Sequence, residues 1–249
     1  MIDKLRVKQR FAAAVSNYDQ QALAQQMIHQ DLITLLAKMG RKHFQLVLEI
    51  GCGTGGLTQH LMQHLQVEQW ELNDLCDIQE YLGEHLPQAF NFYCADAETF
   101  PFMQKYDLIV SASVVQWFED KQQFIVNCKK HLKEQGFLLL STFTQENLKQ
   151  IKQLTGIGLT YPSIEEWQTW LQPEFDILAL TQKEIVLCFE HPLAVLKHLK
   201  QTGVTATQQR GWTKGRLAQF CREYQQKYEN AQQQVELTYS PLYMLARLK

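Results

Sequence analysis

The sequence contains no apolar run approaching the ~18 residues that a membrane-spanning helix needs. Its first residues, MIDKLRVKQRF, are basic, but the apolar segment of a signal peptide does not follow them. The composition, with 45% apolar and 20% charged residues, is ordinary for a globular protein. These features favour a cytoplasmic protein that does not associate with membranes.

Clustered metal ligands are also missing. The six cysteines form no C-x-x-C pair and have no histidine nearby at zinc-site spacing, and the eight histidines form no H-E-x-x-H motif. Reduced, mostly buried thiols are the simplest account of the cysteines. We therefore expect no metal site.

No internal repeat and no long linker rich in Pro, Gly or Ser divides the 249 residues, which favours a single domain over residues 1–249. The net charge of −2 is unevenly distributed. Residues 191–228, called here the basic segment, carry seven Lys or Arg and one acid, whereas the rest of the chain carries a charge of −8. The basic segment indicates either a surface for an anionic partner or a solvated helical face.

Apolar strands alternate with helical stretches over the first 143 residues. A 3.6-residue period predicts a helix over residues 19–39 that ends at Gly40, and further helices over 57–65, 78–86 and 121–133. The predicted strands are LVLEI, QWELND, NFYCAD, YDLIVSAS and GFLLLSTF. Five apolar strands joined by helices predict an α/β fold with a doubly wound, mostly parallel sheet.

The pattern changes after residue 143. Ser163 and Glu166 form a capping box that predicts a helix over residues 163–171. Two long strands, EFDILALTQKEIVLCF and VELTYSPLYMLARL, are expected to pair antiparallel and close a seven-stranded sheet. Pro241 predicts an edge, a bulge or an interruption in the second one. Residues 191–230 are expected to form a helical insertion that acts, with residues 1–30, as a lid.

The stretch LVLEIGCGTGGLT predicts a nucleotide-containing ligand after the first strand, since ligands of open α/β sheets bind beyond the carboxyl ends of the strands. Gly51, Gly53 and Gly56 fit the G-x-G-x-x-G pattern of dinucleotide folds. The same stretch also reads E-x-G-x-G-x-G, from Glu49 to Gly55. A glycine turn that only allows close helix packing is the alternative to both.

Acidic residues favour S-adenosylmethionine (SAM) over NAD. Asp74 can bind a ribose diol in either cofactor. Glu49 suits a sulfonium or α-ammonium group but would repel a pyrophosphate, and Asp96 can accept a hydrogen bond from an adenine amine. A long antiparallel closing pair is also unusual in a nicotinamide-binding half. An NAD-dependent oxidoreductase remains a rival.

The order E-I-G-C-G-T-G, N-D-L, A-D-A and Y-D-L-I-V-S-A-S-V-V-Q-W resembles the motif series of class I SAM-dependent methyltransferases over about residues 46–143. The resemblance implies a Rossmann-like fold with SAM as cofactor and S-adenosylhomocysteine (SAH) as product. The cofactor-binding residues that it implies are Glu49, Gly51, Gly53, Gly55, Asp74, Leu75, Asp96, Ala97 and Ser111.

Flanking segments allow a narrower match. F-A-A-A-V-S-N-Y-D-Q-Q-A-L-A-Q, V-V-Q-W-F-E-D, L-K-Q-T-G-V-T and L-T-Y-S-P-L-Y resemble the malonyl-[acyl-carrier protein] O-methyltransferases of biotin synthesis. That resemblance implies methylation of the free carboxylate of a malonyl thioester on an acidic acyl carrier protein, which the basic segment would attract. Cys76 departs from the small hydroxyl residue of many relatives, and the region after Arg210 is variable.

Other acceptors and partners remain as rivals. A small lipophilic or quinone-type acceptor would fit the same cofactor site. A nucleic-acid-binding role is disfavoured, because the isoelectric point is near 6.4 and few solvent-facing aromatic residues accompany the basic segment. We expect a monomer.

A malonyl carboxylate is already ionised at pH 7, so its methylation needs no general base and depends on positioning. Arg210 is the first candidate for a carboxylate clamp, because arginine offers a fork of donors, with Lys200 and Arg216 as weaker candidates. A surface arginine is the alternative. Tyr18 is expected to cover the cofactor or touch the transferred methyl group.

The remaining candidates flank the predicted cofactor site. Gln25 matches a family position near the methionine end of SAM, although a helix-surface amide is the alternative. Gln116 and Trp117 follow the fourth strand and are expected to face the acceptor, unless Trp117 belongs to the core. The cations expected to steer the carrier protein are Lys4, Arg6, Lys8, Arg10, Lys214, Arg216 and Arg222.

Overall fold

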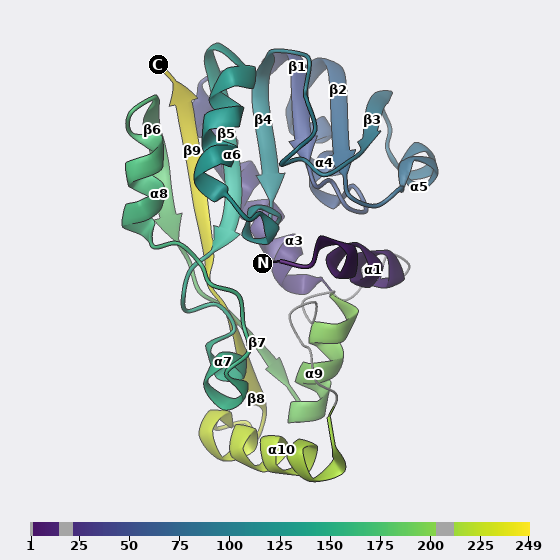
Figure 1. Ribbon diagram of the computed structural model, residues 1–249, viewed down its shortest axis with the longest axis vertical. Helices are drawn as coiled ribbons and strands as arrows, with labels where there is room; N and C mark the ends of the chain where they lie inside the picture. The colour runs from purple at the N-terminus through teal and green to yellow at the C-terminus, as the bar shows by residue number, and fades with distance from the viewer. Residues whose placement is uncertain (1, 15–21, 203–211) are drawn as a thin grey trace.

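A computed structural model places one large twisted sheet between two layers of helices, with a smaller group of elements extending below it (Figure 1). The structure describes residues 2–14, 22–202 and 212–249. The strands of the large sheet are β1 (His43–Ile50), β2 (Gln66–Asp74), β3 (Phe90–Cys94), β4 (Tyr106–Ala112), β5 (Leu132–Phe143), β6 (Phe175–Gln182) and β9 (Pro241–Leu248).

The order across this sheet is β3-β2-β1-β4-β5-β9-β6. The first five strands pair in parallel, and β9 pairs antiparallel with both β5 and β6. The predicted doubly wound sheet with an antiparallel closing strand is therefore confirmed.

Helices cover both faces of the sheet because side chains alternate along each strand. In β1, Val47 packs into one apolar layer, whereas Leu46 and Leu48 pack into the other. The first layer contains α3 (Leu23–Leu35), the 3-10 helix η2 (Leu36–Met39), α4 (Gly56–His64) and α5 (Gln79–His85). The second layer contains α6 (Lys121–His131) and α8 (Ile164–Leu171).

Most local predictions hold at the level of single residues. Gly40 ends the predicted 19–39 helix in the left-handed region with a φ of 64°, although the last turn is 3-10. Ser163 and Glu166 form the expected capping box at the start of α8. The helix predicted over 121–133 ends earlier, because Leu132 already pairs with Tyr106 in the sheet.

The two long closing strands are each broken in two, which corrects the prediction of continuous strands. Their outer halves, β7 (Ile185–Phe189) and β8 (Val235–Tyr239), form a separate antiparallel ribbon. The second break falls at Ser240, directly before Pro241, as the proline predicted. The Ser240 hydroxyl lies 2.7 Å from that of Thr144 and accepts a hydrogen bond from Gln182 Nε2 at 2.9 Å, so hydrogen bonds stabilise the break.

The ribbon carries three further helices, α7 (Lys149–Thr155), α9 (Pro192–Gln201) and α10 (Lys214–Tyr228), and we call this group the arm. Within the predicted insertion over residues 191–230, α9 and α10 are helical. Helix α1 (Lys4–Ala14) lies in Figure 1 between the carboxyl ends of the central strands and α9. In the described ranges, no helix is both long and apolar enough to span a membrane.

Candidate active site

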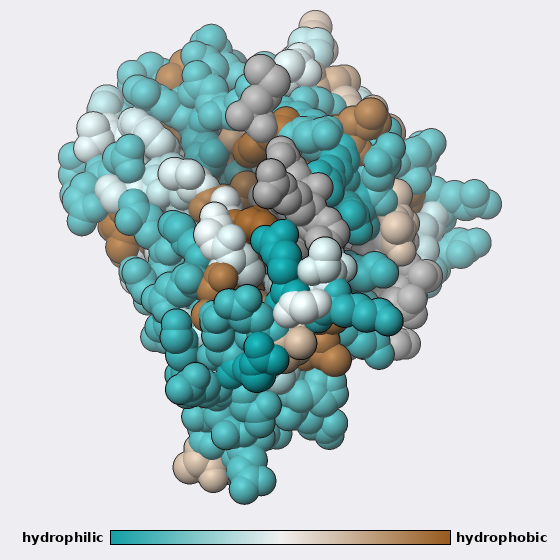
Figure 2. Space-filling model, turned by 60° about the horizontal axis from the view of Figure 1, so that its bottom comes forward, coloured by the Kyte–Doolittle hydropathy of each residue, from teal (hydrophilic) through white to brown (hydrophobic). Residues whose placement is uncertain are grey.

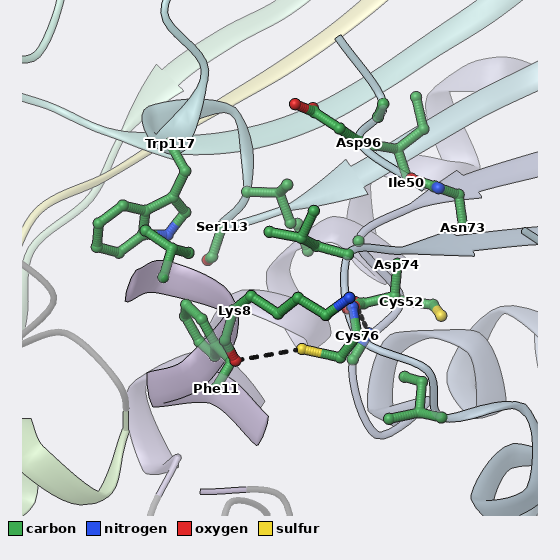
Figure 3. Close-up of a pocket in the computed structure, with 18 of the residues that line it drawn as sticks. Lys8, Phe11, Ile50, Cys52, Asn73, Asp74, Cys76, Asp96, Ser113 and Trp117 are labelled. Atoms are coloured by element: carbon green, nitrogen blue, oxygen red, sulfur yellow. Dashed lines mark hydrogen bonds between the residues drawn. The ribbon is translucent and has the colours of Figure 1, made fainter. Parts of the chain in front are cut away.

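A cavity opens where β1, β2, β3 and β4 end, and α1 and α3 cover it (Figure 3). It spans about 1100 Å³ when its open mouth is included. Ligands of open α/β sheets bind at this edge, so the cavity lies where the glycine loop predicted it.

The glycine loop after β1 brings its backbone to the cavity. Gly51 and Gly53 both line it, with φ angles of 71° and 51° that favour glycine. A Cβ atom on Gly51 would lie 2.2 Å from Val114 Cγ2, whereas one on Gly53 would meet open space. The two glycines are therefore required for different reasons, close packing at Gly51 and backbone conformation at Gly53.

Asp74 ends β2 and holds this loop. Its Oδ2 accepts from the Gly53 amide at 2.9 Å, and its Oδ1 accepts from the Cys76 amide at 2.8 Å. Burial raises the pKa of Asp74 above its usual value, against the opposing effect of these bonds. Asp74 also lines the cavity, where its carboxylate could accept a hydrogen bond from a ribose hydroxyl.

Asp96 lines the cavity beyond β3 and is bound by Lys4 of α1. The Lys4 ammonium lies 2.6 Å from Asp96 Oδ2 and also contacts Glu98. Burial alone would lower the pKa of Lys4, but the two carboxylates raise it. Lys4 was expected on a surface that steers the carrier protein, and this position corrects that expectation. Lys8, expected on the same surface, lines the cavity instead.

Glu49 does not line the cavity but lies behind the glycine loop, with only 1% of its surface exposed. Burial raises its pKa to about 8, while the Thr58 hydroxyl opposes this shift and the charge of Asp74 adds to it. The prediction that Glu49 faces a cationic ligand directly is therefore corrected. Its carboxyl group lies behind the loop, where Oε2 has no hydrogen-bond partner.

Helix α3 contributes Gln25 and, one turn later, His29 to the cavity wall. Gln25 is 5% exposed, and its Oε1 has no hydrogen-bond partner. Burial, with the nearby His60, lowers the pKa of His29 to about 4, so its ring is neutral at pH 7. The predicted position of Gln25 at a ligand is supported, whereas sequence reasoning missed His29.

The other predicted cofactor residues divide into two pairs. Leu75 and Ala97 line the cavity. Gly55 and Ser111 do not. Gly55 is the N-cap of α4 and lies against Leu82, and the buried Ser111 hydroxyl donates to the Ile50 carbonyl oxygen at 2.9 Å. The structure gives Gly55 and Ser111 structural contacts in place of the expected ligand contacts.

The 3-10 helix η3 (Val115–Trp117) follows β4 and places its side chains differently from the prediction. Trp117 lines the cavity and packs edge-on against Phe11 of α1, with ring centroids 6.0 Å apart. Gln116 is buried outside the lining and donates from Nε2 to the Ser113 carbonyl oxygen at 2.6 Å. Its expected contact with the acceptor is therefore corrected to a contact that supports Ser113.

The expected substrate-binding cations lie elsewhere. Lys200, Lys214 and Arg216 are exposed on the arm, and none of them lines the cavity. This position corrects the expectation that Lys200 or Arg216 clamps the carboxylate inside the site. Tyr18 and Arg210 lie outside the described residues.

Ser113 is a cavity residue that the sequence analysis did not single out. It lines the cavity with a φ of 57°, a conformation rare for a residue other than glycine. The sequence signal that could have identified Ser113 is its place directly after a predicted strand.

Within the described ranges, no group of three or more His, Cys, Asp or Glu side chains is arranged to hold a metal ion.

Fold and site together define a class I methyltransferase. Residues 48–138 match the family model described as a methyltransferase domain. The N-methyltransferase NodS from Bradyrhizobium japonicum has the same fold, with a TM-score of 0.60 at 16% identity over 98% of both chains. Magnesium protoporphyrin IX methyltransferase from Synechocystis also has this fold, with a TM-score of 0.54 at 17% identity over 90% of this chain and 83% of that chain.

Sequence relatives narrow the assignment. The malonyl-[acyl-carrier protein] O-methyltransferase of Haemophilus influenzae is 45% identical over 99% of this chain and 95% of its own length. The enzyme of the same name from Porphyromonas gingivalis is 43% identical over 99% of this chain and 96% of its own length. The chain belongs to the malonyl-[acyl-carrier protein] O-methyltransferase family, as the flanking motifs indicated.

Proposed function

We propose that the chain transfers the methyl group of SAM to the free carboxylate of a malonyl thioester on an acyl carrier protein, an early step of biotin synthesis. The observation that carries the proposal is the division of the cavity wall into an acidic end and an apolar end. In Figure 3, Asp74 and Asp96 lie at one end of the cavity, and Trp117 and Phe11 lie at the other. The first end suits an adenosine, and the second shields the reacting groups from water.

The residues present fit SAM. Asp74 would hold the ribose, Asp96 and Ala97 the adenine, and the glycine loop with Gln25 the methionine part. The unpartnered Gln25 Oε1 is a suitable acceptor for an α-ammonium group. When bound, SAM supplies a methyl group activated by its sulfonium. The close packing of Gly51 against Val114 leaves room at the loop for backbone only.

The reaction needs little from the protein beyond alignment. The carboxylate oxygen forms a bond to the methyl carbon while the carbon–sulfur bond breaks, and the electron pair goes to sulfur. No proton moves, because the carboxylate is ionised at pH 7. The chain's contribution is to hold the oxygen in line and to exclude water around Trp117 and Phe11.

The arm is proposed to receive the carrier protein. Its surface is mainly hydrophilic in Figure 2, and the exposed cations Lys214, Arg216 and Arg222 lie on α10. Carrier proteins of this kind are acidic, so these cations would steer the encounter. Helix α1 is proposed as the lid, since Lys4 ties it to the end of β3.

The test is a comparison of acceptors with labelled SAM. Malonyl-carrier protein is expected to accept the methyl group fastest, followed by malonyl-CoA and then free malonate, while acetyl-carrier protein accepts none. Methylation of a quinone-type acceptor alone would instead identify another methyltransferase with the same cofactor site.

A further inference from the structure

Two hydrogen-bond donors at the apolar end of the cavity have no partner. The Ser113 hydroxyl and the Trp117 indole Nε1 are both buried without a hydrogen bond, although both residues line the cavity. Trp117 is only 8% exposed. Figure 3 shows both groups directed into the same part of the cavity. Buried donors are almost always satisfied in native proteins, so this pair indicates a place for a ligand with acceptor oxygens.

The conformation of Ser113 is fixed by three contacts. Its amide donates to the Ser141 carbonyl oxygen at 3.0 Å and to the Ser141 hydroxyl at 3.1 Å. Its own carbonyl oxygen accepts from Gln116 at 2.6 Å. A left-handed serine is strained, and such strain persists where surrounding contacts enforce it, often at functional sites. The backbone of Ser113, and with it the Cβ atom that carries the hydroxyl, is thus held in a set position.

Lys4 and Lys8 are the lysines among the described residues that line the cavity. Lys4 is bound to Asp96 and Glu98. The Lys8 side chain extends toward Asp74 and Cys76 and away from Ser113 in Figure 3. The donors that Ser113 and Trp117 offer to an anion are neutral. Neutral donors can orient a carboxylate without the strong charge pairing that would reduce its reactivity.

We propose that Ser113 Oγ and Trp117 Nε1 donate hydrogen bonds to the malonyl carboxylate, on the oxygen that does not attack the methyl group. This inference rests on the proposed function and assigns the recognition of the carboxylate to these two side chains. Gln116 is a positioning residue that acts through Ser113.

The test measures binding to the enzyme–SAH complex. Ser113→Gly removes the hydroxyl while glycine tolerates the left-handed conformation, and Trp117→Phe removes the indole N–H while it keeps an aromatic ring against Phe11. Each variant is expected to weaken malonyl-carrier protein binding about tenfold to hundredfold, the usual loss for a hydrogen bond to a charged group. The affinities for SAH and for acetyl-carrier protein, which lacks the carboxylate, are expected to stay unchanged.

A matched control is available in the core. Trp167, a residue of α8, is fully buried, and its Nε1 also lacks a partner, but it does not line the cavity. Trp167→Phe is expected to leave malonyl affinity unchanged. Weaker SAH binding with unchanged malonyl binding in Ser113→Gly and Trp117→Phe would overturn the inference and leave the proposed function standing. Wild-type enzyme that fails to prefer malonyl over acetyl carrier protein would instead contradict the proposed function.

The positioning role of Gln116 is tested by a separate variant. Gln116→Leu removes the donor to Ser113, so malonyl affinity is expected to fall while SAH affinity is retained. In a double-mutant cycle, adding Gln116→Leu to Ser113→Gly is expected to cost little more than Ser113→Gly alone. Additive losses would show that Gln116 acts independently of Ser113 and would overturn its positioning role.

Discussion

The Lys4 ammonium lies 2.6 Å from the Asp96 carboxylate, so an ion pair joins the first helix to the end of the third parallel strand. The two residues are 92 positions apart in the chain. Because Asp96 has further acceptor positions, it can bind Lys4 and an adenine amine at once. The same carboxylate would thereby contact both α1 and the cofactor.

Removing this ion pair is expected to weaken cofactor binding. Lys4→Ala should raise the Kd of SAH by about twofold to fivefold, a small effect because partly exposed ion pairs contribute ~0–1 kcal/mol. Calorimetry with Lys38→Ala, an exposed cation on η2, as the control measures this change. Tighter SAH binding in Lys4→Ala would mean that Lys4 competes with the adenine for Asp96.

The two glycines of the loop are expected to respond differently to alanine. Gly51→Ala adds a clash with Val114 to the cost of a positive φ and should destabilise the protein by about 3 kcal/mol or more. Gly53→Ala meets open space and should cost about 1 kcal/mol. Urea unfolding gives both values. Equal losses of stability in the two variants would contradict the close packing of Gly51 against Val114. Adding Val114→Ala to Gly51→Ala should restore part of the lost stability.

Glu49 is expected to make stability depend on pH. The pKa of its carboxyl group is raised from 4.5 to about 8 in the folded state, so its contribution to stability is complete below about pH 4.5 and is lost as the pH rises toward 8. Glu49→Gln is neutral at every pH. Between about pH 4.5 and 8, the free energy of unfolding of Glu49→Gln should therefore rise relative to that of the wild type by about 1.4 kcal/mol per pH unit. Urea unfolding at several pH values measures this difference. The exposed Glu68→Gln is the control, and parallel pH profiles of wild type and Glu49→Gln would contradict the assignment.

Reversing the charge of Lys214, Arg216 and Arg222 together is expected to slow association with malonyl-carrier protein about tenfold at low salt and to weaken its salt dependence. Stopped-flow binding measures both effects. The control reverses Lys42, Lys105 and Lys130, which are also exposed but lie where β1, β4 and β5 begin, at the opposite edge of the sheet. Unchanged association in the α10 variant would remove the docking proposal and leave the chemistry intact.

Local patterns predicted the parts of the site that depend on local chemistry. The glycine loop, Asp74 and Asp96 follow strands, and their place at one edge is fixed by the parallel order of those strands. The family resemblance added Gln25, which does line the cavity. Sequence spacing alone also predicted the capping box at Ser163.

Contacts between distant segments could not be read from the sequence in the same way. Gln116 was expected at the acceptor because it follows a strand, but its amide turns toward Ser113 and Thr142. The left-handed backbone of Ser113 is held by Ser141 in the next strand. The breaks in the closing strands likewise depend on bonds between Ser240 and segments far away in the chain.

The central claim is methylation of the malonyl carboxylate on a carrier protein. Its most direct measurement is intact-protein mass spectrometry of malonyl-carrier protein after incubation with the enzyme and deuterium-labelled SAM, followed by fragmentation of the released acyl arm. The account predicts one added labelled methyl group, located on the terminal carboxylate as an ester. An unchanged mass, or a label on any other atom of the carrier protein, would contradict it.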